Sequence, residues 1–277
     1  MADIYYRNNE GKEIHFDSHP YYLNRETDLF SHRWDYINSE YVDKIEAFNM
    51  RFVEKGFDIG VIGKTAREYD NALRTVNNVF DYDIRNMVPG RLYCGKDYLN
   101  CYIIACEQSS YDIRVNKVVK PYKLVAEKGE WIRETYFSTI KRLTGSDIGL
   151  DFEYDYSYDY AYSDDVDTVI NESVAEADFV MTIYGDASQP EVTIGDNVYA
   201  MNGAISGQER IVINSIDKTV SRISSTGGTY NYFDHRNPEH DIFAKIPSGK
   251  HKINTNDDFP VTITLFNYRS EPEWWKE

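Results

Sequence analysis

The chain has 277 residues, of which 42% are hydrophobic and 15% aromatic, with 24 tyrosines. No run approaches the ~18 consecutive apolar residues of a membrane span, and the first residues lack the basic start and apolar stretch of a secretory signal, so we expect a soluble protein made in a cytoplasm. The net charge of −16 is concentrated after residue 144, and a shortage of Lys and Arg there argues against nucleic-acid binding.

The N-terminal part predicts a mixture of strands and one helix. Residues 1–25 show little periodicity and are expected to form an arm or an edge strand. Residues 29–37 (LFSHRWDYI) and 52–62 (FVEKGFDIGVI) have the length and composition of half-buried strands.

A change of period predicts a helix from Thr65 to Phe80. Thr65 is a candidate N-cap, with Glu68 three residues later in a capping-box arrangement. The apolar residues recur at spacings of three and four, which is typical of an amphipathic helix. They are Ala66, Tyr69, Ala72, Leu73, Val76, Val79 and Phe80.

Three strand-like segments follow a turn at residues 88–90 (VPG): RLYCG, DYLNCYIIACEQ and YDIRVNKVVKPYKLVAEK. Gly95-Lys96 is the expected hairpin connection between the first two. We therefore predict an α+β domain over residues 1–145, in which one helix lies on a mainly antiparallel sheet.

A second domain is predicted over residues 146–277. It begins with tyrosines at every second position, which an extended strand would place on one face. These are Tyr154, Tyr156, Tyr158, Tyr160 and Tyr162. We expect the rings to lie in packing contacts or at an interface, with subunit contact and glycan stacking as the alternatives, because five adjacent exposed rings would favour aggregation.

From Phe179 onward short β-type runs alternate with turn residues, among them Asp196-Asn197. The runs are FVMTIYG, EVTIGDNVYAM, ERIVINSI, KTVSRIS, TYNYF, DIFAKI and VTITLFNY. This spacing predicts an all-β sandwich or jelly roll. The last ~10 residues contain Trp274 and Trp275 and are expected to dock back on the protein or on a neighbouring subunit.

Motifs that carry chemistry are absent from the sequence. It contains no Walker loop, GxGxxG, HExxH, GxSxG or EF-hand signature. The closely spaced histidines His15 with His19 and His235 with His240 come without a third ligand, so no metal site is predicted. Of the three cysteines, Cys101 and Cys106 are expected to be small buried hydrophobes. We predict no catalytic residue, no cofactor and no enzyme activity.

Four segments together resemble the distal tail protein (Dit) family of phages that infect Gram-positive bacteria. They are LFSHRWDY from Leu29, NNVFDYDIRNMVPGRLYCGKDYLNCYI from Asn77, YDYSYDYAY from Tyr154 and YRSEPEW from Tyr268. The resemblance spans nearly the whole chain. It implies an N-terminal α+β domain that assembles into a six-membered ring and a C-terminal sandwich similar to galectins.

The resemblance implies a structural component of the virion tail tip, assembled in the host cytoplasm. Its partners would be its own copies, the tail tube protein, the tail-associated hub or fibre protein, and a receptor-binding protein or host glycan. Two alternatives stay open: a carbohydrate-binding adhesin that recognises the host wall, and a wall-degrading enzyme. A galactose-type constellation of His, Asn, Arg and Trp is not recognisable in residues 179–268, and fold analogy alone does not predict sugar binding.

Overall fold

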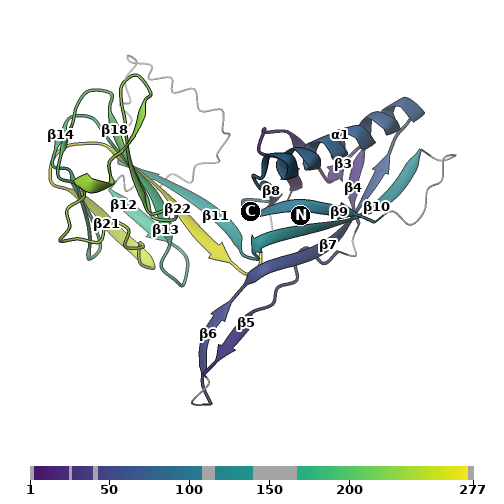
Figure 1. Ribbon diagram of the computed structural model, residues 1–277, viewed down its shortest axis with the longest axis horizontal. Coiled ribbons are helices and arrows are strands. Elements are labelled where there is room, and N and C mark those ends of the chain that lie inside the picture. The colour runs from purple at the N-terminus through teal and green to yellow at the C-terminus, as the bar shows by residue number, and fades with distance from the viewer. Residues whose placement is uncertain (1–2, 25–26, 40–42, 108–115, 140–166, 274–277) are drawn as a thin grey trace. The chain divides into compact units, whose positions relative to one another are not determined.

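The computed structural model describes residues 3–24, 27–39, 43–107, 116–139 and 167–273. These residues form mostly antiparallel β-structure with one α-helix (Figure 1). The chain divides into two compact units: unit 1 contains residues 1–133 and 268–277, and unit 2 contains residues 134–267. The boundary predicted at 145/146 lies outside the described residues, as do all five tyrosines of the predicted ladder and both Trp274 and Trp275.

Unit 1 is built from the helix and the first eleven strands. They are β1 (Ile4–Arg7), β2 (Glu13–His15), β3 (Asp17–Ser18), β4 (Tyr21–Leu23), β5 (Asp35–Asn38), β6 (Ile45–Asn49), β7 (Arg51–Ile62), α1 (Ala66–Asn86), β8 (Gly90–Cys94), β9 (Asp97–Cys106), β10 (Lys117–Lys128) and the start of β11 (Trp131–Ser138). Strands β11, β9, β10, β7, β4 and β3 are neighbours in that order, and β1 pairs with β2 and β8.

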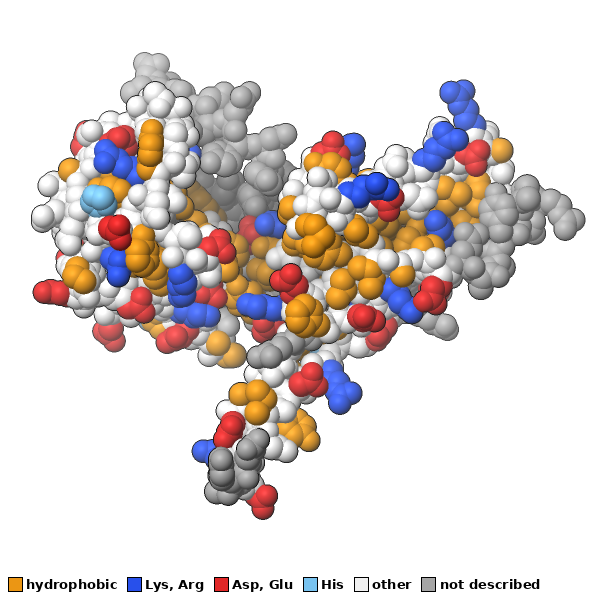
Figure 2. All heavy atoms as spheres, in the orientation of Figure 1, with side chains coloured by type: hydrophobic (Ala, Val, Ile, Leu, Met, Phe, Trp, Pro, Cys, Tyr) orange, Lys and Arg blue, Asp and Glu red, His pale blue; other side chains and the backbone are white. Residues whose placement is uncertain are grey.

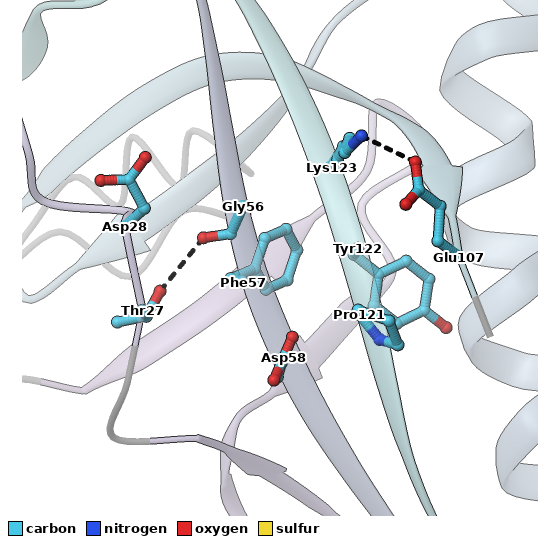
Figure 3. A pocket seen from close by; sticks show the side chains of 9 residues that line it. All are labelled: Thr27, Asp28, Gly56, Phe57, Asp58, Glu107, Pro121, Tyr122 and Lys123. Carbon is cyan, nitrogen blue, oxygen red and sulfur yellow. Dashed lines mark hydrogen bonds and ion pairs between the residues drawn. The ribbon is translucent and has the colours of Figure 1, made fainter. Parts of the chain in front are cut away.

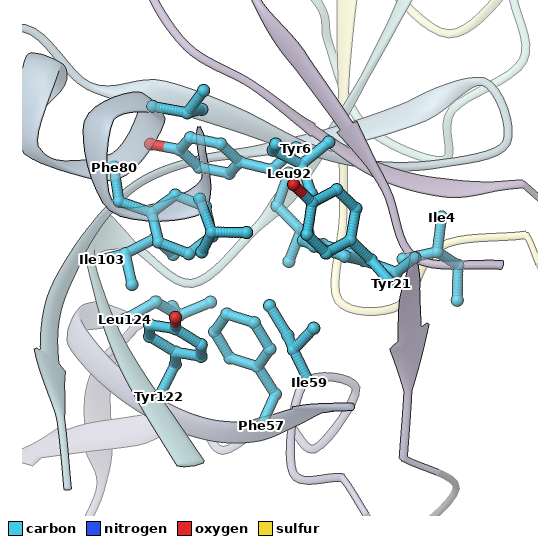
Figure 4. Close-up of a cluster of buried hydrophobic side chains, with 14 of the residues drawn as sticks. Ile4, Tyr6, Tyr21, Phe57, Ile59, Phe80, Leu92, Ile103, Tyr122 and Leu124 are labelled. Atoms are coloured by element: carbon cyan, nitrogen blue, oxygen red, sulfur yellow. The ribbon is translucent and has the colours of Figure 1, made fainter. Parts of the chain in front are cut away.

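The core of unit 1 lies between α1 and the inner faces of β7, β9 and β10. Alternate residues of β7 and β10 are buried, as period-two patterning requires when one face of a sheet is covered. Tyr122 stacks on Phe57 of β7 at 5.8 Å between ring centroids and meets Phe80 of α1 edge-on at 5.2 Å. Figure 4 shows these rings converging.

Helix α1 begins where the sequence predicts and ends later. The Thr65 hydroxyl accepts a hydrogen bond from the Glu68 N–H at 3.2 Å, which confirms the N-cap. The Glu68 carboxylate accepts instead from the N–H of Lys64, one residue before the cap, so the box is not reciprocal. The predicted end at Phe80 is wrong, since the helix continues to Asn86. The apolar pattern stops at Phe80 because the next inward-facing position holds a polar residue, Asp83, which is nevertheless fully buried.

The described residues of unit 2 are all-β apart from one short 3-10 helix, η1 (Phe233–His235). Its remaining strands are β12 (Thr168–Asn171), β13 (Asp178–Tyr184), β14 (Ala187–Ser188), β15 (Glu191–Ile194), β16 (Asn197–Ala200), β17 (Ala204–Ile205), β18 (Arg210–Asn214), β19 (Thr219–Ile223), β20 (Thr229–Asn231), β21 (Gly249–Thr255) and β22 (Val261–Arg269). One sheet holds β20, β19, β18, β13 and β22, and a second has the order β12-β21-β15-β16. Both contribute to a single core, so unit 2 is a sandwich.

Several local predictions were wrong. Residues 1–25 supply four strands: β2 and β3 lie at sheet edges, as predicted, whereas β1 lies between β2 and β8 with Tyr6 fully buried. Residues 29–34 are not strand, and the strand that follows is exposed throughout. Residues 241–246 (DIFAKI), predicted as a strand, contain a turn at Ile242 and Phe243. Within them, Ile246 forms an isolated bridge to Ala177. Cys106 is exposed, since β9 extends past the edge of the core there.

No helix among the described residues combines the length and apolarity needed to cross a membrane.

The hairpin predicted at Gly95-Lys96 is confirmed, since β8 and β9 pair from Cys94 and Asp97 outward. The turn between β15 and β16 lies at Gly195-Asp196, one residue before the predicted Asp196-Asn197.

Candidate interaction surfaces

The buried ionisable groups of unit 1 bond to one another and to the backbone. The Tyr6 hydroxyl donates to Asp83 Oδ2 at 2.6 Å, and the Asn9 N–H donates to Asp83 Oδ1 at 2.8 Å. Burial raises the pKa of Asp83 above its ordinary value. Lys55 donates from its ammonium group to the carbonyls of Leu29 and Ser31 at 2.8 and 2.7 Å, while burial lowers its pKa. These contacts hold the segment before β5 against β7.

The histidines singled out in the sequence lie in separate places. His19 Nε2 is 2.7 Å from a carboxylate oxygen of Glu68, and His235 stacks on Tyr232. Within the described ranges, Asp3, His15 and Asp17 form one group whose ligand atoms lie within 4.8 Å of one another. All three side chains are at least partly exposed, and exposed carboxylates gather in this way without an ion.

An aromatic ladder crosses four strands of unit 1, and sequence analysis missed it. His15, Tyr5, Tyr93 and Tyr98 are successive cross-strand partners on β2, β1, β8 and β9. Tyr5 and Tyr93 stack at 4.5 Å with their planes 5° apart, and burial with the neighbouring Tyr93 raises the pKa of Tyr5 to about 12. Tyr5 stacks on both His15 and Tyr93, and Tyr98 lies tilted against Tyr93, so the ladder stabilises the sheet through cross-strand pairs.

The most exposed apolar feature of unit 1 is the hairpin of β5 and β6, which we call the arm. These two strands pair with each other and with no other strand of the described chain. Tyr36 and Phe48 are direct cross-strand partners and are 60% and 61% exposed. Figures 1 and 2 show the arm standing away from the sheet of unit 1 with orange side chains along it. A two-stranded hairpin without a partner is marginally stable in water.

A groove of about 520 Å³ lies on unit 1 along β7 and β10 (Figure 3). It is lined by Thr27, Asp28, Gly56, Phe57, Asp58, Glu107, Pro121, Tyr122 and Lys123. The Lys123 ammonium is bonded to Glu107 at 2.7 Å, and Asp28 and Asp58 add two further carboxylates. The groove is therefore open and acidic.

The last described residues, Tyr268–Glu273, belong to unit 1, and we call them the C-terminal strap. Asp97, which is fully buried, accepts two hydrogen bonds from Arg133 at 2.8 and 2.9 Å and one from the Glu273 N–H at 2.8 Å. The Glu273 carboxylate in turn pairs with Arg133 at 2.8 Å and with Arg269. The strap is thus fastened to β9 and β11 through one buried carboxylate.

In unit 2, polar and aromatic side chains gather around Arg222 of β19. Arg222 pairs with Glu209 at 2.6 Å and lies 5.6 Å from the centre of the Tyr232 ring. His235 stacks on Tyr232 at 3.9 Å between ring centroids and is itself exposed. Glu209 and Arg222 are 13 positions apart, and Tyr232 and His235 lie three residues apart at the start of η1, so the cluster is built from neighbouring segments of the chain.

The fold is similar to that of a phage distal tail protein and of a phage baseplate chain, which supports the resemblance found in the sequence. It is similar to SPP1 Dit (gp 19.1), described as a paradigm of the hub adsorption apparatus in phages infecting Gram-positive bacteria, with a TM-score of 0.60 at 10% identity over 97% of this chain and 99% of that one.

It is also similar to a chain of the phage P2 baseplate in its activated conformation. The structure with Ca gives a TM-score of 0.59 and that with Sr 0.60, each at 11% identity over 98% of this chain and 100% of the other. No family model matches the sequence, and no curated protein is similar to it.

Proposed function

We propose that this chain is a structural component of a phage tail tip, a distal tail protein that forms a ring between the tail tube and the tail-associated hub and supports the host-adsorption apparatus. The observation that carries the proposal is the exposed apolar arm of unit 1. Monomeric proteins rarely leave such patches uncovered, so the arm implies a protein partner.

The likeness to SPP1 Dit and to the P2 baseplate chain supports this assignment, since it spans both units. In the proposed arrangement unit 1 forms the ring, and unit 2, as a galectin-like sandwich, is held at the periphery. The excess of acidic residues after residue 144 suits an outward, solvated position.

The proposed role is assembly and not catalysis. Its partners are further copies of this chain, the tail tube protein and the hub or fibre protein, and its place is the virion tail tip after assembly in the host cytoplasm. Groups with shifted pKa values are candidates for catalysis, but Asp83 and Lys55 are buried and bonded to Tyr6 and to the Leu29 carbonyl. Their structural contacts explain their burial and support a role in assembly.

Light scattering over a range of protein concentrations tests ring formation. A hexamer of the 32.3 kDa chain has a mass of roughly 194 kDa. We expect that species at micromolar concentration. A mass of one chain at every concentration, with no change on adding the tail tube protein, contradicts the proposal.

A second candidate function, glycan binding by unit 2, is favoured by the cluster around Tyr232. The Arg222–Glu209 pair offers hydrogen-bond donors and acceptors, and the exposed His235 ring, which stacks on the buried Tyr232, offers a flat surface of the kind that sugar sites combine with them. Calorimetric titration with host wall polysaccharide tests it, with Arg222→Ala as the variant and Arg210→Ala, on the neighbouring strand, as the matched control. Binding that Arg222→Ala leaves unchanged excludes this cluster.

A further inference from the structure

The proposed function gives no role to one group of side chains in unit 1. Asp3 precedes β1, His15 is the last residue of β2 and Asp17 is the first of β3, and each offers a ligand atom within 4.8 Å of the other two. Exposed carboxylates alone often gather without an ion. The evidence for a metal site here comes instead from the setting of the histidine and from one buried carboxylate oxygen.

The imidazole of His15 is held so that one ring nitrogen is left for another partner. His15 Nε2 lies 3.0 Å from Glu13 Oε2, and because an ionised carboxylate only accepts hydrogen bonds, Nε2 carries the proton. Glu13 is fixed in turn by Arg7, whose Nε donates to it at 2.7 Å. The His15 ring also stacks on Tyr5, with 4.9 Å between the ring centroids. A neutral imidazole in this setting presents the lone pair of Nδ1 in a fixed direction.

That nitrogen faces the carboxylate of Asp3. His15 Nδ1 is 3.7 Å from Asp3 Oδ2, a distance too long for a hydrogen bond. The other oxygen, Asp3 Oδ1, is buried and has no hydrogen-bond partner among the described residues. A buried acceptor without a donor costs free energy, and a carboxylate that faces a nitrogen lone pair is repelled by it. A cation bound between the two groups offsets both costs.

The donor atoms suit an ion of the zinc type. Two ligands of a tetrahedral ion with bonds of about 2.05 Å lie about 3.4 Å apart, close to the separation of His15 Nδ1 and Asp3 Oδ2. Asp17 has its main chain fixed by pairing with Tyr22, while its exposed side chain is free to turn toward the ion. Imidazole favours zinc over calcium or magnesium, and a ligating histidine usually donates its second N–H to a carboxylate, as His15 does to Glu13.

We propose that Asp3, His15 and Asp17 bind a divalent metal ion of the zinc class. His15 Nδ1 is its nitrogen ligand, Glu13 orients the imidazole, and water fills the open positions. The ion links the start of β1 to the point where the chain leaves β2 for the β3–β4 pair. The site does not depend on the proposed ring.

Calorimetric titration of the full chain with Zn²⁺ tests the site. Cys106→Ser is the background, because Cys106 is an exposed thiol and thiolates bind zinc. Asp17→Asn changes an exposed side chain and is expected to weaken Zn²⁺ binding by at least about tenfold. The matched control is His19→Asn, whose histidine lies 2.7 Å from a Glu68 oxygen without belonging to the three-ligand group. It should bind Zn²⁺ like the background.

Nuclear magnetic resonance of the imidazole nitrogens separates a metal ligand from a structural ion pair. In the metal-free background at mildly alkaline pH, His15 should carry its proton on Nε2 alone. Added Zn²⁺ should shift the Nδ1 resonance of His15 and leave that of His19 in place. Glu13→Gln, which acts only through the histidine, should weaken Zn²⁺ binding by about tenfold.

Two results would overturn the metal site. One is Zn²⁺ binding that both Asp17→Asn and Glu13→Gln leave unchanged. The other is a metal-free His15 with protons on both nitrogens at that pH, because the imidazolium would itself neutralise Asp3 and Glu13. Neither result bears on the ring, which light scattering tests separately.

Discussion

Asp97 is predicted to hold the C-terminal strap in place. The change Asp97→Asn keeps the shape of the side chain but removes its charge and turns an NH₂ group toward the Arg133 guanidinium, which has only 12% of its side chain exposed. Breaking a buried ion pair by removing one partner costs about 3–5 kcal/mol. Because Glu273 still pairs with Arg133, we expect the lower end, about 3 kcal/mol.

A loss of about 3 kcal/mol raises the population of the opened strap roughly 150-fold, since each 1.4 kcal/mol is a factor of ten. Native-state hydrogen exchange measured by mass spectrometry reports this directly. Faster exchange is expected in residues 268–273 and in the parts of β9 and β11 that contact them. Strands β13 and β18 in the core of unit 2 should exchange as in the wild type.

The matched control is Glu271→Gln, also in the strap. Its partner is His32, 3.0 Å away, and its own side chain is 54% exposed, so we expect a change below about 0.5 kcal/mol. Equal exchange of the strap in Asp97→Asn and the wild type would refute the role assigned to Asp97. A general increase across both units would show that the substitution acts on the whole fold.

Three further predictions concern the interior of unit 1. Gly90→Ala should destabilise the unit by about 3 kcal/mol in urea unfolding, because the new Cβ would lie 2.2 Å from the Tyr6 hydroxyl and 2.4 Å from the Asp83 carboxylate. Lys55→Met should cost about 2 kcal/mol by leaving the buried Leu29 carbonyl and the partly buried Ser31 carbonyl without their donor, whereas Lys123→Met, at an exposed ion pair, should leave the stability unchanged. Since burial raises the pKa of Asp83, its contribution is fully present below the ordinary value of 3.8 and is lost as pH rises through the higher folded pKa. The stability of the wild type relative to Asp83→Asn should therefore fall from acidic to neutral pH, and a constant difference would contradict this.

The sequence by itself determined the elements whose patterns are local. The cap of α1 at Thr65, the hairpin at Gly95-Lys96 and the strands β7, β13 and β22 all follow from hydrophobic period and turn residues. Burial of one face imposes period two on a strand and about 3.6 on a helix, so one short window suffices. The resemblance to distal tail proteins likewise rests on short segments of sequence.

Contacts between distant residues were decided by the tertiary structure alone. Helix α1 continues to Asn86 because Asp83 finds Tyr6, which lies 77 positions away in sequence. Composition predicts a half-buried strand where the arm begins, but β5 is exposed. Local composition shows that a strand has an apolar face and does not show whether another element covers that face. The bond from the Glu273 N–H to Asp97 spans 176 positions. Patterns in the sequence fix which face of an element is apolar, but only the packed chain fixes what that face meets.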